Sequence, residues 1–233
     1  MNTDMARWLE HDPEEIIKSV TNCISNATKR FLSDGNSLQD ISSIGITNQR
    51  ETTVVWDSET GKPLTNAVVW SDTRTAPIVT HFKSLGREEQ IRQISGLPLS
   101  TYFSAVKLRW MIDHVSSVKR ALEEGKLAFG TIDSWVLYNL TGKKIHVTDS
   151  TNASRTLLLD IHKLKYSDEL IDFFGLGGIK LPEIRPSSEV YGTVAEGDLK
   201  GVEIAGCLGD QSAALVGHRG FDKGAAKNTY GTG

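Results

Sequence analysis

The stretch EIAGCLGDQSAALVG, residues 203–217, joins a predicted strand directly to a predicted helix. Residues 203–209 form a short, mainly apolar run that is typical of a buried strand, and the small apolar residues of 211–217 favour a packed helix. In open α/β sheets, ligands bind beyond the carboxyl ends of the strands, which is where Asp210 lies. Asp210 is therefore a candidate functional carboxylate, although aspartate also caps helices routinely. Gly209 would leave room for a ligand to approach it.

The rest of the chain alternates between predicted strands and helices in the same way. Strands are expected at 41–47, 52–57 and 66–70, where the turn at 58–61 favours a hairpin or meander, and at 127–131 and 189–194. Helices are expected from the Asp12–Pro13 capping sequence through Phe31, and over 73–94, 104–124, 132–140 and 168–174. This mixture predicts an α/β fold class.

Composition excludes several classes of protein. The chain has 233 residues and a formal net charge of −3, without a basic block, so we expect neither nucleic acid nor an anionic membrane surface as its main partner. No apolar run approaches the length of a membrane span. Cys23 and Cys207 both lie in apolar patterns and are predicted to be reduced core residues, which fits a reducing compartment. No Cys or His cluster has metal-site spacing, so no metal ligand is predicted.

Arg50 and Glu51 place opposite charges side by side between two predicted strands, in ITNQRETTVVWD at residues 46–57. Arginine offers a fork of donors and glutamate offers acceptors, so the pair could grip neighbouring hydroxyl groups of a polyol. Adjacent residues of a regular strand point to opposite faces, so both can reach one ligand only if the chain bends here. A solvated corner between strands is the alternative.

Aromatic residues and a glycine-rich turn are weaker signals. Trp70 closes one predicted strand, and Tyr102–Phe103 precedes a helix. Their rings could cover the CH faces of a small polyol, or they could simply pack in the core. The turn at 229–233, TYGTG, could direct backbone N–H groups and hydroxyls at phosphate oxygens, or be an ordinary turn.

Several long stretches together resemble one family. The stretches are GITNQRETTVVWD, NAVVW, LPLSTYFSAVKLRW, FGTIDSWVLYNLTG, TDSTNASRT, SSEVYG, GCLGDQSAALVG and AKNTYGTG. In this order, and along nearly the whole chain, they are similar to the glycerol kinases of the FGGY carbohydrate kinase family. Their sequences most resemble those of the animal members.

The resemblance implies an actin-like ATPase fold, in which two α/β domains of ribonuclease-H type flank a cleft. Residues 1–218 would form most of the N-terminal, glycerol-binding domain, and residues 219–233 would begin the C-terminal, nucleotide-binding domain. The implied reaction transfers the γ-phosphoryl group of Mg²⁺-ATP to glycerol and gives sn-glycerol 3-phosphate and ADP. A cytoplasmic location is expected. Docking on the mitochondrial outer surface and assembly into a homo-oligomer are left open.

Site roles carry over only where this sequence matches the family's motifs. The implied glycerol contacts are Arg50, Glu51, Trp70, Tyr102, Asp210 and Gln211. Asp210 also matches the family's catalytic base, which accepts the hydroxyl proton. Gly231 and Thr232 match the turn that contacts the nucleotide phosphates.

Two departures lead us to expect an incomplete chain. The family begins with a strand–turn–strand that binds ATP phosphates, and it continues beyond the NTYGTG turn into a complete second domain. This sequence contains neither part, so productive ATP binding by these residues alone is not expected. The alternatives are a truncated, non-catalytic form that binds a polyol or a partner, and a kinase for another small polyol.

Overall fold

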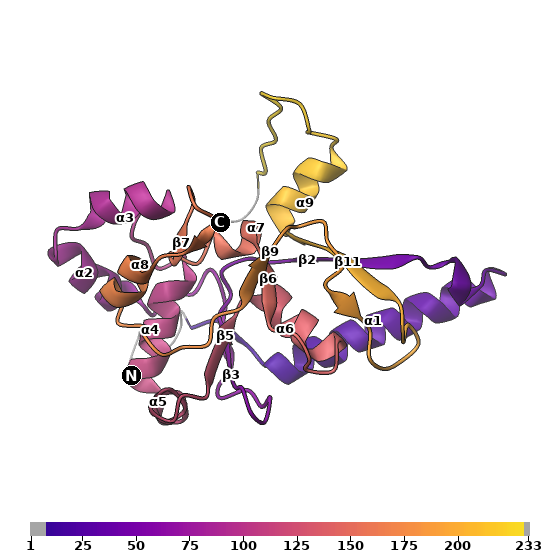
Figure 1. Ribbon diagram of the computed structural model, residues 1–233, viewed down its shortest axis with the longest axis horizontal. Helices are drawn as coiled ribbons and strands as arrows, with labels where there is room; N and C mark the ends of the chain where they lie inside the picture. The colour runs from indigo at the N-terminus through magenta and orange to yellow at the C-terminus, as the bar shows by residue number, and fades with distance from the viewer. Residues whose placement is uncertain (1–7, 231–233) are drawn as a thin grey trace.

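The computed structural model describes residues 8–230, in which helices pack on both sides of short sheets (Figure 1). The strands are β1 (Glu10–His11), β2 (Ser43–Asn48), β3 (Val54–Asp57), β4 (Ala67–Val68), β5 (Leu127–Gly130), β6 (Val147–Asp149), β7 (Leu159–Asp160), β8 (Lys165–Tyr166), β9 (Glu183–Arg185), β10 (Gly192–Thr193) and β11 (Glu203–Gly209). The helices are α1 (Pro13–Ser33), α2 (Ala76–Ser84), α3 (Glu88–Ser95), α4 (Ser104–His114), α5 (Ser116–Glu123), α6 (Ile132–Leu140), α7 (Ser150–Ala153), α8 (Asp168–Phe173) and α9 (Asp210–Gly217), with a 3₁₀ turn at Leu38–Asp40. The predicted α/β class is confirmed.

The sheet that carries the site has the strand order β10-β11-β2. β11 and β2 run parallel, and their last residues, Gly209 and Asn48, are register partners. The carboxyl ends of the two strands therefore meet at one edge, as expected for a ligand-binding edge. Arg50 follows β2 and Asp210 follows β11, so two segments 160 residues apart in sequence arrive at one place.

The antiparallel pair β3–β5 separates two hydrophobic cores. Val55 and Phe129, which are register partners, belong to the core beneath α2–α5 and α8. Trp56 and Ala128, one position further along, belong to the core shared with α6, β11 and α1. The alternation follows from the two-residue period of a strand. In Figure 1 the first group of helices lies to the left of this pair and α1 and α6 lie to its right.

Helix α1 begins as predicted. The Asp12 side chain accepts a hydrogen bond from the Glu14 amide at 2.8 Å, and Pro13 occupies the first helical position. The indole Nε1 of Trp135 donates to the Pro13 carbonyl at 2.8 Å, which ties the start of α1 to α6.

Three predicted elements differ from the structure. Residues 73–94 form two helices, because the chain turns at Gly86 with φ of +70°. Residues 104–124 also split, at Val115, whose backbone is extended (φ −115°, ψ 109°). The expected meander over 41–70 is wrong for its first strand: β2 pairs with β11, whereas β3 pairs with β5 and touches β4 through the bridge Thr53–Val68.

The two cysteines also differ from each other. Cys207 is buried in β11 as predicted, but Cys23 is exposed on α1. It borders an apolar groove lined by α1, β2 and α6, where Ile24, Ile44 and Ile46 are only partly buried. Within the described residues no helix combines the length and hydropathy needed to cross a bilayer.

Candidate active site

The chain bends sharply where β2 ends. Glu51 has φ of +58°, a left-handed conformation that is uncommon for a residue with a side chain. The Thr52 amide donates to the Arg50 carbonyl at 2.6 Å and closes a three-residue turn. The bend that the Arg50–Glu51 prediction required is therefore present, and the two side chains leave it toward different partners.

Arg50 points to the first residue of α9. Its Nε lies 3.4 Å from Oδ1 of Asp210, whose side chain is 48% exposed. The two groups form an ion pair, and the Nε atom is buried and makes no hydrogen bond within residues 8–230. Gly209 serves this arrangement in a way the sequence did not predict. A Cβ at Gly209 would lie 2.4 Å from Cδ of Arg50, so the space beside it holds the arginine stem rather than a ligand.

Glu51 pairs instead with Arg155, a residue that the sequence reasoning assigned no role. The Arg155 Nε donates to Oε1 of Glu51 at 2.5 Å, and the Glu51 side chain is 3% exposed. Burial raises the pKa of Glu51 above its usual range, and the nearby cations Arg155, Arg50 and Lys107 offset part of that rise. Arg155 stands in the quoted motif TDSTNASRT, but nothing in its spacing from Glu51 indicates the contact.

The aromatic candidates separate into a pocket pair and a core residue. The rings of Trp70 and Tyr102 are 5.1 Å apart and tilted by 50°, and both side chains are partly exposed. Phe103 is 4% exposed and belongs to the core. The Nζ of Lys107, which is fully buried, donates to the carbonyls of Thr101 and Tyr102 and holds this loop from below.

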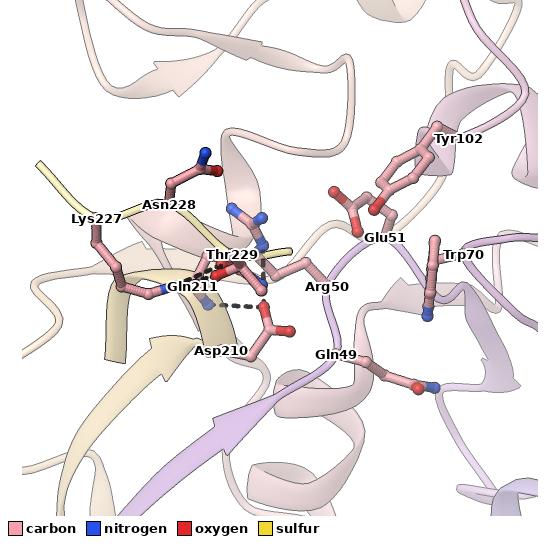
Figure 2. A pocket seen from close by; sticks show the side chains of 10 residues that line it. All are labelled: Gln49, Arg50, Glu51, Trp70, Tyr102, Asp210, Gln211, Lys227, Asn228 and Thr229. Carbon is pink, nitrogen blue, oxygen red and sulfur yellow. Dashed lines mark hydrogen bonds and ion pairs between the residues drawn. The ribbon is translucent and has the colours of Figure 1, made fainter. Parts of the chain in front are cut away.

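These groups enclose a pocket of about 490 Å³ at the strand ends (Figure 2). Trp70, Tyr102 and Glu51 lie on one side, and Asp210 and Gln211 face them from the other. The lining residues are Gln49, Arg50, Glu51, Trp70, Tyr102, Asp210, Gln211, Lys227, Asn228 and Thr229. Every glycerol contact implied by the resemblance is thus in one pocket, whereas Gln49, Lys227 and Asn228 were not predicted.

The far wall of the pocket comes from the segment after α9. Thr229 Oγ1 and Lys227 Nζ each contact Oε1 of Gln211 at 2.9 Å, and Lys227 also donates to Thr229. The predicted nucleotide contacts Gly231 and Thr232 lie outside the described residues.

Comparison with known proteins identifies the family. Residues 1–217 match the N-terminal domain of the FGGY family of carbohydrate kinases. The chain belongs to this family. A probable glycerol kinase of Caenorhabditis elegans is 50% identical over 230 residues, which is 97% of this chain and 45% of the relative. Glycerol kinase 2 of Thermotoga maritima is 50% identical over 228 residues, again 97% of this chain and 45% of the relative.

Solved FGGY structures share the fold. A Plasmodium falciparum glycerol kinase with ADP superposes with a TM-score of 0.88 at 38% identity, over 99% of this chain and 46% of that one. A gluconate kinase from Lactobacillus acidophilus superposes with a TM-score of 0.78 at 23% identity, over 91% and 42%, and shows the fold alone. The chain has the fold of the N-terminal part of FGGY kinases, which share the actin-like ATPase fold. It spans about half the length of the curated relatives it matches.

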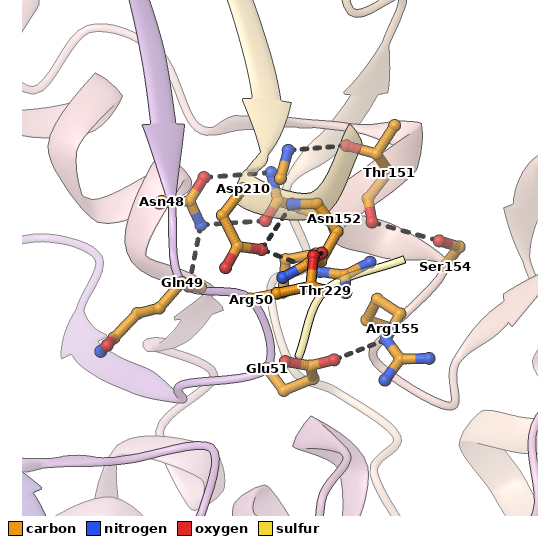
Figure 3. Close-up of polar contacts among 12 residues, drawn as sticks. Asn48, Gln49, Arg50, Glu51, Thr151, Asn152, Ser154, Arg155, Asp210 and Thr229 are labelled. Atoms are coloured by element: carbon orange, nitrogen blue, oxygen red, sulfur yellow. Dashed lines mark hydrogen bonds and ion pairs between the residues drawn. The ribbon is translucent and has the colours of Figure 1, made fainter. Parts of the chain in front are cut away.

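A buried polar layer supports the strand ends of this FGGY chain (Figure 3). The side-chain amides of Asn48 and Asn152 bond each other at 2.9 and 3.3 Å. Thr151 Oγ1 donates to Asp149 at 2.7 Å and accepts the Gly209 amide at 2.8 Å. The layer fixes the end of β11, and with it Asp210, against the end of β2.

Three buried groups below this layer form a cluster that sequence spacing did not reveal. A carboxylate oxygen of Asp133, a carboxylate oxygen of Asp149 and the Sγ of Cys207 lie within 4.8 Å of one another. Each carboxylate already accepts hydrogen bonds, for example from Thr148 to Asp133 at 2.6 Å and from Ser187 to Asp149 at 2.8 Å. Burial raises the pKa of Asp133 to about 6. These hydrogen bonds account for the cluster as an internal polar network of this chain.

Proposed function

We propose that the pocket binds glycerol, and that this domain serves a kinase that transfers the γ-phosphoryl group of ATP to a terminal hydroxyl of glycerol. The observation that carries the proposal is the meeting of Arg50, Glu51 and Asp210 with the aromatic pair in one pocket at the strand ends. The glycerol kinases among the relatives support the choice of substrate.

The pocket offers a three-carbon polyol complementary groups. The Arg50 guanidinium, which lines the pocket, provides donors, and the Glu51 carboxylate keeps Oε2 free of hydrogen bonds within residues 8–230. A hydroxyl group both donates and accepts, so neighbouring hydroxyls can engage both residues at once. Trp70 and Tyr102 would cover the CH face of the chain, where burial of apolar surface adds to binding. Gln211 would add a polar contact from α9.

Asp210 is proposed as the general base. In phosphoryl transfer the protein mainly positions the reactants and stabilises charge, while a carboxylate accepts the proton of the attacking hydroxyl. The Gln211 amide holds Oδ1 of Asp210 at 2.8 Å, and Oδ2 makes no hydrogen bond within the described residues. That oxygen is on a half-exposed side chain at the pocket wall and is free to approach a bound hydroxyl.

ATP and Mg²⁺ complete the proposal. Residues 1–218 would carry the glycerol site and residues 219–233 would begin the nucleotide domain, with Gly231 and Thr232 contacting phosphate. Mg²⁺ would neutralise the charge of the ATP phosphates when the nucleotide is bound. A cytoplasmic location is a prediction of the resemblance, which leaves docking on the mitochondrial surface and homo-oligomer formation open.

Calorimetric titration of the 233-residue chain with glycerol tests the proposal. Glycerol should bind, and Trp70→Ala should abolish measurable binding without unfolding the chain, whereas the exposed Trp8→Ala should bind as wild type. Propane-1,2-diol, which lacks one hydroxyl of glycerol, should bind more weakly, because it would leave a polar group of the site without a hydrogen-bond partner. Preference for a five-carbon polyol would contradict glycerol as the substrate. Absence of polyol binding by a cooperatively folded chain would contradict the function.

A further inference from the structure

Glu51 depends on another residue for its charge and its orientation. Its side chain is 3% exposed, and it stands on a left-handed backbone turn. A buried carboxylate is costly unless it is paired and hydrogen-bonded. The group that pairs with Glu51 therefore decides whether this wall of the pocket presents an ionised acceptor.

Two of the three cations near Glu51 are engaged elsewhere. Arg50 is directed to Asp210, with Nε 3.4 Å from Oδ1. Lys107 donates to the carbonyls of Thr101 and Tyr102. Within the described residues, Arg155 is the sole hydrogen-bond donor to the Glu51 carboxylate.

Arg155 also contacts the aromatic wall. Its guanidinium carbon lies 5.4 Å from the ring centre of Tyr102 and 4.9 Å from that of Phe103, within the range of cation–π attraction. Arg155 itself does not line the pocket. It reaches Glu51 from the segment that follows α7, and Figure 3 shows the two side chains joined by their hydrogen bond.

From this geometry we infer that Arg155 is a positioning residue of the polyol site, which keeps Glu51 ionised, directs its free oxygen into the pocket and fixes Tyr102. The inference rests on the proposed polyol function. The contact at Oε1 leaves Oε2 for a hydroxyl donor, so Arg155 acts on the ligand through Glu51. Lysine cannot replace it fully, because an ammonium group lacks both the planar fork and the stacking face.

The pH dependence of binding separates positioning from a merely structural role. The titratable and charged groups that face Glu51 are Arg50, Lys107, Arg155 and Tyr102. Removing Arg155 takes away the hydrogen bond and the closest positive charge, so the pKa of Glu51 should rise further. Arg155→Met should then weaken glycerol binding about tenfold or more at pH 6.5, and raising the pH should recover part of the loss. Arg155→Lys should fall between wild type and Arg155→Met.

Arg185→Met is a matched control. Arg185 is also 25% exposed and ion-paired, with Glu183 at 3.0 Å, but it does not line the pocket or contact Glu51. This variant should bind glycerol as wild type at every pH. A thermal melt followed by circular dichroism establishes that each variant is folded, and Arg155→Lys tests the inference if Arg155→Met does not fold.

A ligand-free measurement distinguishes failure of the inference from failure of the proposed function. Carbon NMR of ¹³C-glutamate-labelled chain, with the Glu51 signal assigned by Glu51→Gln, reports the Glu51 titration directly. A higher Glu51 pKa in Arg155→Met than in wild type supports the coupling of the two residues. If wild type also binds no glycerol, that second result overturns only the proposed polyol function. Two results would overturn the inference. One is a Glu51 pKa that is the same in Arg155→Met as in wild type, and the other is an Arg155→Met chain that binds glycerol as tightly as wild type at every pH.

Discussion

Arg50 and Asp210 meet across the parallel strands β2 and β11, with Nε 3.4 Å from Oδ1, although 160 residues separate them in sequence. The contact exists because Asn48 and Gly209 end their strands in register. It leaves Oδ2 of Asp210 without a hydrogen bond within residues 8–230 and brings the Arg50 guanidinium into the same pocket, which is the arrangement that the proposed reaction requires.

Replacing Asp210 with Asn should separate binding from chemistry. Asparagine keeps the shape of the side chain but cannot accept the hydroxyl proton, and general-base catalysis contributes roughly 10²–10⁴ in rate. We expect glycerol affinity within a few-fold of wild type by calorimetry. Phosphorylation, assayed in a polypeptide that spans the full length of the relatives, should fall by about that factor.

Asp113→Asn provides the control for this substitution. Asp113 is also about half exposed, at 44%, and pairs with Arg109 at 2.5 Å away from the pocket. It should leave turnover unchanged. Turnover like that of wild type in Asp210→Asn would refute the assignment of Asp210 as the base.

Gly209→Ala should displace Arg50. The added methyl group would lie 2.4 Å from Cδ and 2.8 Å from Cγ of Arg50, so the arginine stem must move. We expect glycerol affinity to fall about tenfold, the value of one hydrogen bond to a charged group. Gly45→Ala, in the neighbouring strand β2, meets no atom within 4 Å and should bind as wild type. Equal affinities of the two variants would show that Arg50 does not contribute to binding.

The sequence predicted those parts of the site that depend on local pattern. The strand–helix junction at Asp210 and the bend at Arg50–Glu51 are local features, and both are present. The resemblance to the FGGY family, which is confirmed for residues 1–217, supplied Trp70 and Tyr102 as proposed aromatic contacts, which spacing could not separate from core residues.

Features that depend on contacts distant in sequence were not predictable. Arg155 lies 104 positions from Glu51 and stands in a segment whose pattern gives no sign of the pairing. The pairing of β2 with β11 rather than with β3 likewise depends on the whole fold, since neighbouring strands in sequence often pair but need not. Cys23 shows the same limit, because helical periodicity finds the apolar face of α1 but not what covers it.

The two cysteines should react at very different rates. Cys23 is exposed on α1, whereas Cys207 is buried and its pKa is raised well above its usual range, chiefly by burial. Only the thiolate is nucleophilic. Iodoacetamide at pH 8 should therefore modify Cys23 in the native chain and Cys207 only after unfolding, as read by peptide mass spectrometry. The variant Cys23→Ser should take up no label until denatured, and rapid native labelling of Cys207 would contradict its burial.

Lys107 should make the folded chain more stable as the pH rises above neutrality. Burial lowers the pKa of Lys107 from 10.5 to about 7, partly offset by Glu51 and Asp72. Between these values the unfolded chain carries a proton at this position that the folded chain does not, so the free energy of unfolding increases with pH, by up to about 1.4 kcal/mol per pH unit. Below about pH 7 both states are protonated and the contribution is constant.

Urea unfolding from pH 6 to 9 checks this dependence by comparison of variants. Lys107→Met removes the titrating group, so its free energy of unfolding should rise less with pH than that of wild type. Lys119→Met makes the same change of charge at an exposed position of α5 and should follow wild type. The slopes of wild type and Lys107→Met are the informative quantities, because loss of the donors to Thr101 and Tyr102 lowers stability equally at each pH. Identical slopes would mean that Lys107 stays charged in the folded chain.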